Sequence, residues 1–212
     1  MIIISHRGYW KTPAEKNTPE AFRRSFGAGY GTETDIRDCG GELVIAHDPP
    51  DADALTFGEF LEIYAEMGSG LPLALNVKAD GLQPMVRSAL EQAGIPLRDV
   101  YFFDMSVPDT LGYAAVGLPF YCRHSDLEPQ PALYEKATGV WLDAFFGEWY
   151  DMETVRQHLD AGKAVALVSP DLHKRPHEAL WMALKANPDL VQHPALTLCT
   201  DFPEDAKAMI HA

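Results

Sequence analysis

The chain has 212 residues, of which 47% are hydrophobic and 23% are charged. This composition is typical of globular proteins and excludes a disordered chain, and the length is sufficient for one α/β barrel. Acidic residues outnumber basic ones by 31 to 17, and the formal net charge of −14 disfavours nucleic acid and anionic membrane surfaces as partners. We therefore expect a small ligand, and an anionic ligand would need local cationic side chains.

The N-terminal residues and the cysteines predict a cytoplasmic protein. Residues 2–4 are isoleucines that run directly into Ser5-His6-Arg7, which leaves no basic leader and no long apolar core for a signal peptide. No apolar run is long enough to cross a bilayer, so we expect no stable membrane association. Three widely spaced cysteines lack zinc-type pairing and are expected to be reduced thiols: Cys39, Cys122 and Cys199. No pattern predicts the oligomeric state.

Short β-like runs alternate with amphipathic helix-like runs along the whole chain, a pattern typical of parallel βα units. The second strand region has two arms, which only the turn at residues 38–41 separates. The eight expected strand regions are Ile2–Ser5, Thr32–Ile36 with Leu43–Ala46, Leu73–Val77, Val100–Phe103, Pro119–Arg123, Val140–Asp143, Ala164–Val168 and Leu196–Cys199.

Helix-like segments fill the gaps between these strands. The eight expected helices are Pro19–Ala28, Phe57–Glu66, Gln83–Ala93, Pro108–Ala115, Ala132–Lys136, Met152–Ala161, His177–Lys185 and Pro203–Ile210. Eight strands and eight helices without a break in composition predict a compact, single (β/α)8 TIM barrel, an α/β fold, with one domain over residues 1–212. An open doubly wound sheet is the alternative, because closure of a sheet is invisible in sequence.

Polar residues follow the first two strands, where the loops of a barrel build its active site. His6 and Arg7 place a group that titrates near neutrality beside a permanent cation suited to phosphate. Glu33 and Asp35 lie two residues apart, so strand alternation puts both carboxylates on one face. Such a pair needs a compensating cation, and hard oxygen ligands suit Mg²⁺ or Ca²⁺. The alternative is an exposed edge strand with both acids in water.

The next two strand ends add a second histidine, an amide and an ammonium group. His47 follows residues 43–46, and two histidines beside a metal site supply the proton acceptor and the proton donor that phosphodiester cleavage requires. Asn76 and Lys78 share one face of the third strand, where Asn76 can bind a metal ion through its carbonyl oxygen and Lys78 can neutralise phosphate charge. The alternatives are a structural histidine and a salt bridge between Lys78 and an acid.

Several of these residues form an ordered set of motifs. The motifs are His6-Arg7-Gly8, Asn17-Thr18 with Ala21-Phe22, Glu33-x-Asp35, His47-Asp48 and Asn76-x-Lys78. This set resembles the glycerophosphodiester phosphodiesterase family of the phospholipase-C-like phosphodiesterase TIM barrels. The segment from Cys199 to Pro203 is similar to that family's closing strand and final helix start, so the resemblance spans nearly the full chain.

The resemblance implies a barrel enzyme that hydrolyses glycerophosphodiesters with one divalent cation, Mg²⁺ or Ca²⁺. It implies proton transfer by His6 and His47, metal ligation by Glu33 and Asp35, and phosphate contacts by Arg7 and Lys78. This sequence departs from the family at Asn76, where the family usually has a third acidic ligand; the loss of one charge should weaken cation binding. Asp80, on the same strand face, is a candidate to compensate.

Later strand ends supply weaker candidates for contacts to a substrate headgroup. Arg123 after the fifth strand is the first of these, followed by Asp143 and Ser169. For residues 171–175 a solvated loop is the stronger interpretation. The expected function is therefore a metal-dependent phosphoric diester hydrolase, and the alternative is a phosphodiester-binding or regulatory barrel with weakened or lost chemistry. A sugar-phosphate lyase or isomerase is a third possibility that fits the two histidines less well.

Overall fold

The computed structural model describes residues 1–51 and 53–211. The chain divides into two compact units, one comprising residues 1–5 together with the chain from Tyr121 onward, and the other His6–Phe120. Each unit contains parallel strands connected by helices, and the unit His6–Phe120 also has one antiparallel strand. The expectation of one domain over residues 1–212 stays a prediction.

The unit His6–Phe120 holds the sheet that carries most of the predicted site. Its strands are β2 (Gly31–Cys39), β3 (Glu42–Ile45), β4 (Leu73–Val77) and β5 (Val100–Phe103). Strands β2, β4 and β5 run parallel, whereas β3 pairs antiparallel with β2 through a hairpin. Its helices are η1 (Pro13–Glu15), α1 (Pro19–Gly27), α2 (Phe57–Met67), α3 (Gln83–Gln92), η2 (Leu97–Asp99) and α4 (Val107–Ala115).

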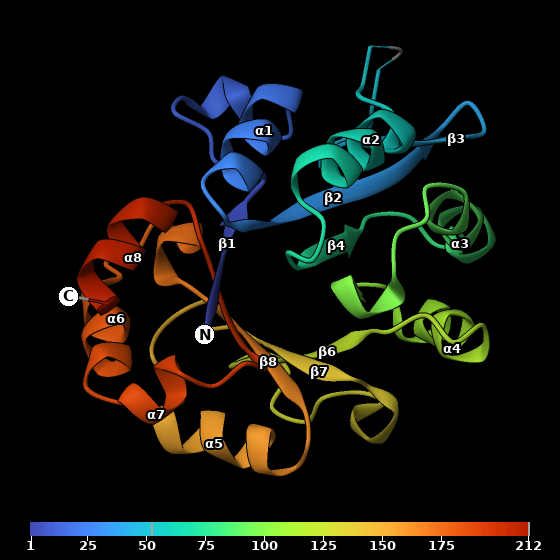
Figure 1. The fold of residues 1–212 in the computed structure, drawn as a ribbon. Coiled ribbons are helices and arrows are strands. Elements are labelled where there is room, and N and C mark those ends of the chain that lie inside the picture. Colours follow the sequence, from blue (N-terminus) through green and yellow to red (C-terminus); the bar gives the residue numbers. More distant parts are fainter. Residues whose placement is uncertain (52, 212) are drawn as a thin grey trace. The chain divides into compact units, whose positions relative to one another are not determined.

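Helices α1 and α2 pack against each other beside β2 (Figure 1). The Thr18 side chain accepts a hydrogen bond from the Ala21 amide and so fixes the start of α1. The rings of Phe22 and Phe60 meet edge to face with their centroids 4.7 Å apart, and both side chains are fully buried. This packing anchors the loop that precedes α1 against the sheet.

The other unit contains five parallel strands in the order β1–β9–β8–β7–β6. The strands are β1 (Ile2–His6), β6 (Tyr121–His124), β7 (Gly139–Leu142), β8 (Ala164–Val168) and β9 (Leu196–Thr200). Its helices are η3 (Tyr134–Lys136), α5 (Met152–Asp160), η4 (Pro170–His173), α6 (Glu178–Lys185), α7 (Pro188–Val191) and α8 (Pro203–His211). Helices α6 and α8 lie side by side in this unit (Figure 1).

In the described part of the chain, eight parallel strands alternate with helices, so the predicted α/β TIM-barrel fold class is confirmed. The boundaries of β4, β5 and β8 are as predicted. The predicted helix Ala132–Lys136 is wrong, because a single 3-10 turn, Tyr134–Lys136, occupies it after Leu133 in the left-handed region. The short helix α7 was not predicted.

No helix within residues 1–51 and 53–211 is both long and apolar enough to cross a membrane. The cytoplasmic location stays a prediction.

Candidate active site

A tight turn after the first strand positions Arg7. Arg7 and Gly8 have φ values of 60° and 82°, in the left-handed region that non-glycine residues rarely adopt. A Cβ atom on Gly8 would lie 2.7 Å from the Cβ of Ala21, so only glycine lets α1 approach this closely. The Arg7 amide donates to the Glu33 carbonyl at 2.9 Å, which holds the turn beside β2.

Glu33 and Asp35 are buried on one face of β2, with exposed fractions of 2% and 0%. Strand β2 pairs with β4 over residues 32–36 and with β3 from Ile36 onward, so it is not a solvated edge. The alternative of two acids in water is therefore excluded. Two buried carboxylates need compensating charge or hydrogen bonds.

Two cations compensate the charge of Asp35. Arg7 Nε lies 2.9 Å from its Oδ2 atom, and Lys78 Nζ lies 3.4 Å from its Oδ1 atom. The Asn17 amide also donates to Oδ2, at 3.0 Å. Asn17 has a φ of 59°, and its Oδ1 atom accepts a hydrogen bond from the Thr34 hydroxyl. The salt bridge given as the alternative for Lys78 is thus present, and the phosphate contact of Lys78 stays a prediction.

Glu33 is less well compensated than Asp35. Its Oε2 atom lies 3.8 Å from His6 Nε2 and accepts no hydrogen bond from any residue that the structure describes. Burial, followed by the charge of Asp35, raises the pKa of Glu33 to about 8. Asp104 adds to this rise, whereas Arg7 and Lys78 oppose it.

The third predicted metal ligand, Asn76, lies next to Asp35. The two residues are register partners on β4 and β2, and Asn76 is 8% exposed. Its Oδ1 atom accepts no hydrogen bond within the described chain, nor do Glu33 Oε2 and Asp35 Oδ1. Buried oxygens without donors fit a hard cation such as Mg²⁺ or Ca²⁺. Asp80 is exposed and accepts a hydrogen bond from Ser106 at 2.8 Å.

An all-acid metal centre is not formed here. Within residues 1–51 and 53–211, no group of three or more His, Cys, Asp or Glu side chains has a geometry that could hold a metal ion. This agrees with an amide, rather than a carboxylate, at position 76. A cation at this site would therefore rely on two carboxylates and one neutral oxygen.

His47 and Arg7 line one cavity of about 660 Å³, together with Asn17 and Asp48. The β2–β3 hairpin brings His47 to this cavity, and Arg37 Nε donates to the His47 carbonyl at 3.0 Å. The His47 side chain is 44% exposed, and its Nδ1 atom lies 3.0 Å from Asp48 Oδ1. This contact orients the ring and is compatible with the alternative of a hydrogen-bonded structural histidine, so the catalytic role of His47 stays a prediction.

The predicted substrate contact Arg123 lies in the unit that begins at Tyr121. Its guanidinium forms an ion pair with Asp143, and its Nε atom lies 3.4 Å from Glu128 Oε2. Asp143 is buried and also lies 2.7 Å from His173 Nε2. The ion pairs give Arg123 a structural role that the strand pattern did not indicate. A contact between Arg123 and the substrate stays a prediction.

Two other interpretations of the later loops change with the structure. The expected solvated loop at residues 171–175 is wrong for Asp171, which is 6% exposed and accepts hydrogen bonds from Thr200 Oγ1 and the Asp201 amide. The Ser169 hydroxyl is buried and accepts a hydrogen bond from Trp181 Nε1 at 3.0 Å. Sequence reasoning also missed Asp104, although a carboxylate directly after strand β5 is the same signal that identified the other candidates.

Comparison with family models and with curated proteins finds no match for this chain. Several solved structures resemble it. A provisionally assigned glycerophosphodiester phosphodiesterase from Galdieria sulphuraria is 18% identical, with a TM-score of 0.79 over 100% of this chain and 98% of its own. A glycerophosphodiester phosphodiesterase from Agrobacterium tumefaciens str. C58 is 14% identical, with a TM-score of 0.71 over 98% of this chain and 99% of its own.

A phosphodiesterase from Oleispira antarctica, solved in complex with the product sn-glycerol-3-phosphate, is 17% identical. Its TM-score is 0.71 over 100% of this chain and 97% of its own. At these identities the likeness is one of fold rather than of chemistry. The chain has the α/β TIM-barrel fold of these solved glycerophosphodiester phosphodiesterases.

Proposed function

We propose that this protein is a phosphoric diester hydrolase of the glycerophosphodiester phosphodiesterase family. The observation that carries the proposal is the buried Asp35 carboxylate held between Arg7 and Lys78, because it brings two cations to one place at the strand ends. A phosphodiester carries one negative charge and adds another in its transition state, which such cations stabilise. The shared fold of solved phosphodiesterases supports this assignment.

A divalent cation is part of the proposal. Glu33, Asp35 and Asn76 would hold it through the three buried oxygens that accept no hydrogen bond among the described residues. When bound, Mg²⁺ or Ca²⁺ would act as a Lewis acid toward a phosphoryl oxygen. The chain's own cations, Arg7 and Lys78, would bind the remaining phosphate oxygens and orient the phosphorus atom.

His6 and His47 would exchange the two protons of the reaction. One imidazole takes a proton from the attacking hydroxyl as its oxygen bonds to phosphorus, and the other, protonated, gives its proton to the leaving oxygen as that P–O bond breaks. The contacts of His6 with Glu33 and of His47 with Asp48 would orient the two rings. The attacking hydroxyl is water or a neighbouring hydroxyl of the substrate, and the latter would yield a cyclic phosphate.

Phosphorus NMR of glycerophosphocholine and glycerophosphoinositol turnover, with Mg²⁺ or Ca²⁺ present, tests the activity and its first product. We expect sn-glycerol-3-phosphate or a cyclic phosphate to accumulate, and both His6→Gln and His47→Gln to lower the rate by about 10² or more. Turnover of no diester with either metal would reject the proposal. Full activity of both histidine variants would reject the assigned proton transfer.

A second candidate is a barrel that binds phosphodiesters without cleaving them. The ion pairs of Arg7 and Lys78 with Asp35 favour this second candidate, because they already compensate the charge of Asp35. Asn76 adds no negative charge that would attract a cation. Calorimetric titration with Mg²⁺ and Ca²⁺ separates the two candidates. Metal binding that Glu33→Gln abolishes supports the hydrolase, whereas diester binding without metal binding or turnover supports the second candidate.

A further inference from the structure

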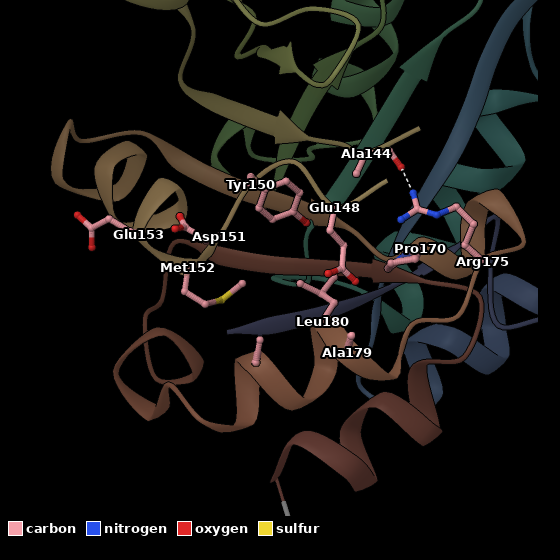
Figure 2. Close-up of a pocket in the computed structure, with 11 residues that line it drawn as sticks. Ala144, Glu148, Tyr150, Asp151, Met152, Glu153, Pro170, Arg175, Ala179 and Leu180 are labelled. Atoms are coloured by element: carbon pink, nitrogen blue, oxygen red, sulfur yellow. Dashed lines mark hydrogen bonds between the residues drawn. The ribbon is translucent and has the colours of Figure 1, made fainter. Parts of the chain in front are cut away.

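A second cavity, of about 430 Å³, lies within the unit that begins at Tyr121 (Figure 2). Helices α5 and α6 and the loops after β7 and β8 line it. Its volume falls in the range of small-molecule sites in proteins. Its lining residues include none of the predicted catalytic or metal-binding residues.

The floor and one wall of this cavity are apolar. Leu180 and Ala183 come from successive turns of α6, and Met152 comes from the start of α5. The Tyr150 side chain covers another side, and burial, together with the charges of Asp143 and Glu148, raises the pKa of its hydroxyl. A ligand here would therefore bury a hydrocarbon segment.

Three acids and one cation line the same cavity: Glu148, Asp151, Glu153 and Arg175. Arg175 Nη1 donates to the Ala144 carbonyl at 2.5 Å, which fixes the guanidinium at one end and leaves its other N–H groups available (Figure 2). Glu148 points into the cavity beside Tyr150 (Figure 2). Among the described residues, neither the exposed Glu148 nor Arg175 forms an ion pair, although the charge of Arg175 also acts on Asp126 and Tyr150. At the cavity edge, the Asp151 carboxylate accepts a hydrogen bond from the Thr154 amide at 2.9 Å.

We propose that this cavity binds a small zwitterion, with its anionic group on Arg175, its ammonium group on Glu148 and its hydrocarbon part on Leu180. A cation and an acid that line one cavity without forming an ion pair with each other, above an apolar floor, match a molecule that carries both charges. An amino acid and the phosphate ester of an amino alcohol share this chemistry. None of the residues that line this cavity has a role in the diesterase reaction proposed above.

Isothermal titration calorimetry of the full chain tests this site. The probes are L-leucine and phosphoethanolamine, with 3-methylbutylamine and 4-methylpentanoate as leucine analogues that lack one charge each. We expect L-leucine or phosphoethanolamine to bind at least about tenfold more tightly than 3-methylbutylamine and 4-methylpentanoate, because each charged contact contributes separately to the affinity. Preference for leucine or for phosphoethanolamine identifies the anionic group.

Three variants locate the binding. Glu148→Gln should lower the affinity for the zwitterion about threefold to tenfold and leave the affinity for 4-methylpentanoate unchanged. Ala183→Met should abolish binding by filling the cavity. Glu178→Gln makes the same charge change at an exposed residue of α6 that does not line the cavity, and it should have no effect. Retained binding in Lys78→Met separates this site from the diesterase site. No zwitterion binding at millimolar concentration, or equal effects of Glu148→Gln and Glu178→Gln, would overturn the proposal.

Discussion

At the scale of single residues, the two acids of β2 differ in their surroundings although the sequence presents them as a pair. Asp35 contacts Arg7, Lys78 and Asn17, whereas Glu33 has one oxygen without a hydrogen bond in the described chain. Asp35 therefore holds the arrangement of cations together, and Glu33 is available to an added cation. The same substitution should have different consequences at the two positions.

We predict that Asp35→Asn destabilises the metal-free protein and Glu33→Gln does not. The first leaves Arg7 and Lys78 without their shared carboxylate and should lower the free energy of unfolding by about 2–4 kcal/mol. Glu33→Gln removes no charge that a cation compensates, and it should change the free energy of unfolding by less than about 1 kcal/mol. Urea unfolding followed by circular dichroism in EDTA measures both values. Equal losses in the two variants would contradict the difference assigned here.

A substitution at Asn76 tests the amide in the metal set. Asn76→Asp adds a charged oxygen beside Asp35, and we expect it to tighten Mg²⁺ or Ca²⁺ binding by about tenfold. The rate at saturating metal should fall or stay level, because the added charge lowers the positive potential that Arg7 and Lys78 present to the diester. Metal titration by calorimetry gives the affinity. An unchanged affinity would remove Asn76 from the ligand set.

At the scale of elements, the turn between β1 and α1 sets the position of the site. Its backbone passes through the left-handed region at Arg7 and Gly8, and α1 packs directly on Gly8. Asn17 and Asp104 also have left-handed backbone conformations. The Asn17 side chain donates a hydrogen bond to Asp35, and the charge of Asp104 acts on Glu33. Strained backbone of this kind is common at functional sites.

We predict that Gly8→Ala impairs activity more than its backbone strain alone explains. The added methyl group would meet Ala21 at 2.7 Å and push the turn, with His6 and Arg7, away from β2. Gly29→Ala is the matched control, since Gly29 has a φ of 78° and no atom within 4 Å of the added Cβ. Both should lose about 1 kcal/mol from strain, and Gly8→Ala about 1–3 kcal/mol more from the clash. Similar losses of stability and activity in the two variants would contradict the packing argument.

At the scale of the whole molecule, stability should depend on the buried His158 and its contact with the partly exposed His124. His158 of α5 lies 2.9 Å from His124 Nδ1 through its Nε2 atom, and its Nδ1 atom lies 2.9 Å from the Tyr134 hydroxyl. Burial, followed by the charge of His124, lowers the pKa of His158 to about 4. The folded protein therefore keeps this ring neutral at a pH where the unfolded chain binds a proton.

We predict that the free energy of unfolding rises between about pH 4 and pH 6.5 because of His158. In this window the unfolded state binds more protons than the folded state, so this contribution is complete above the unfolded pKa and is lost as the pH falls. The loss should be about 1–2 kcal/mol, since solvent reaches part of the ring. Thermal unfolding of wild type and His158→Gln at pH 7 and pH 5 measures it. Parallel pH dependence in both proteins would contradict the prediction.

Local pattern predicted the elements well where burial and alternation agree. The mostly apolar segment Leu73–Val77, which includes Asn76, is a buried strand with the predicted bounds. The predicted helix at 132–136 fails because the segment is short and Leu133 adopts a left-handed backbone, a conformation that no apolar period reveals. The Gly40-Gly41 turn indicates that the segment after it folds back beside β2. The antiparallel pairing of β3 with β2 is established by their backbone hydrogen bonds.

The sequence by itself determined that Glu33 and Asp35 share a face, that His6 and His47 follow strands, and that position 76 carries an amide, because alternation and strand ends are local properties of the chain. Only the tertiary structure decided that Arg7 and Lys78 meet on Asp35, that Asp104 acts on Glu33, and that Arg123 pairs with Asp143. Those contacts join residues from different strands and loops. Their formation depends on sheet register and on the burial of charge, which no local pattern contains.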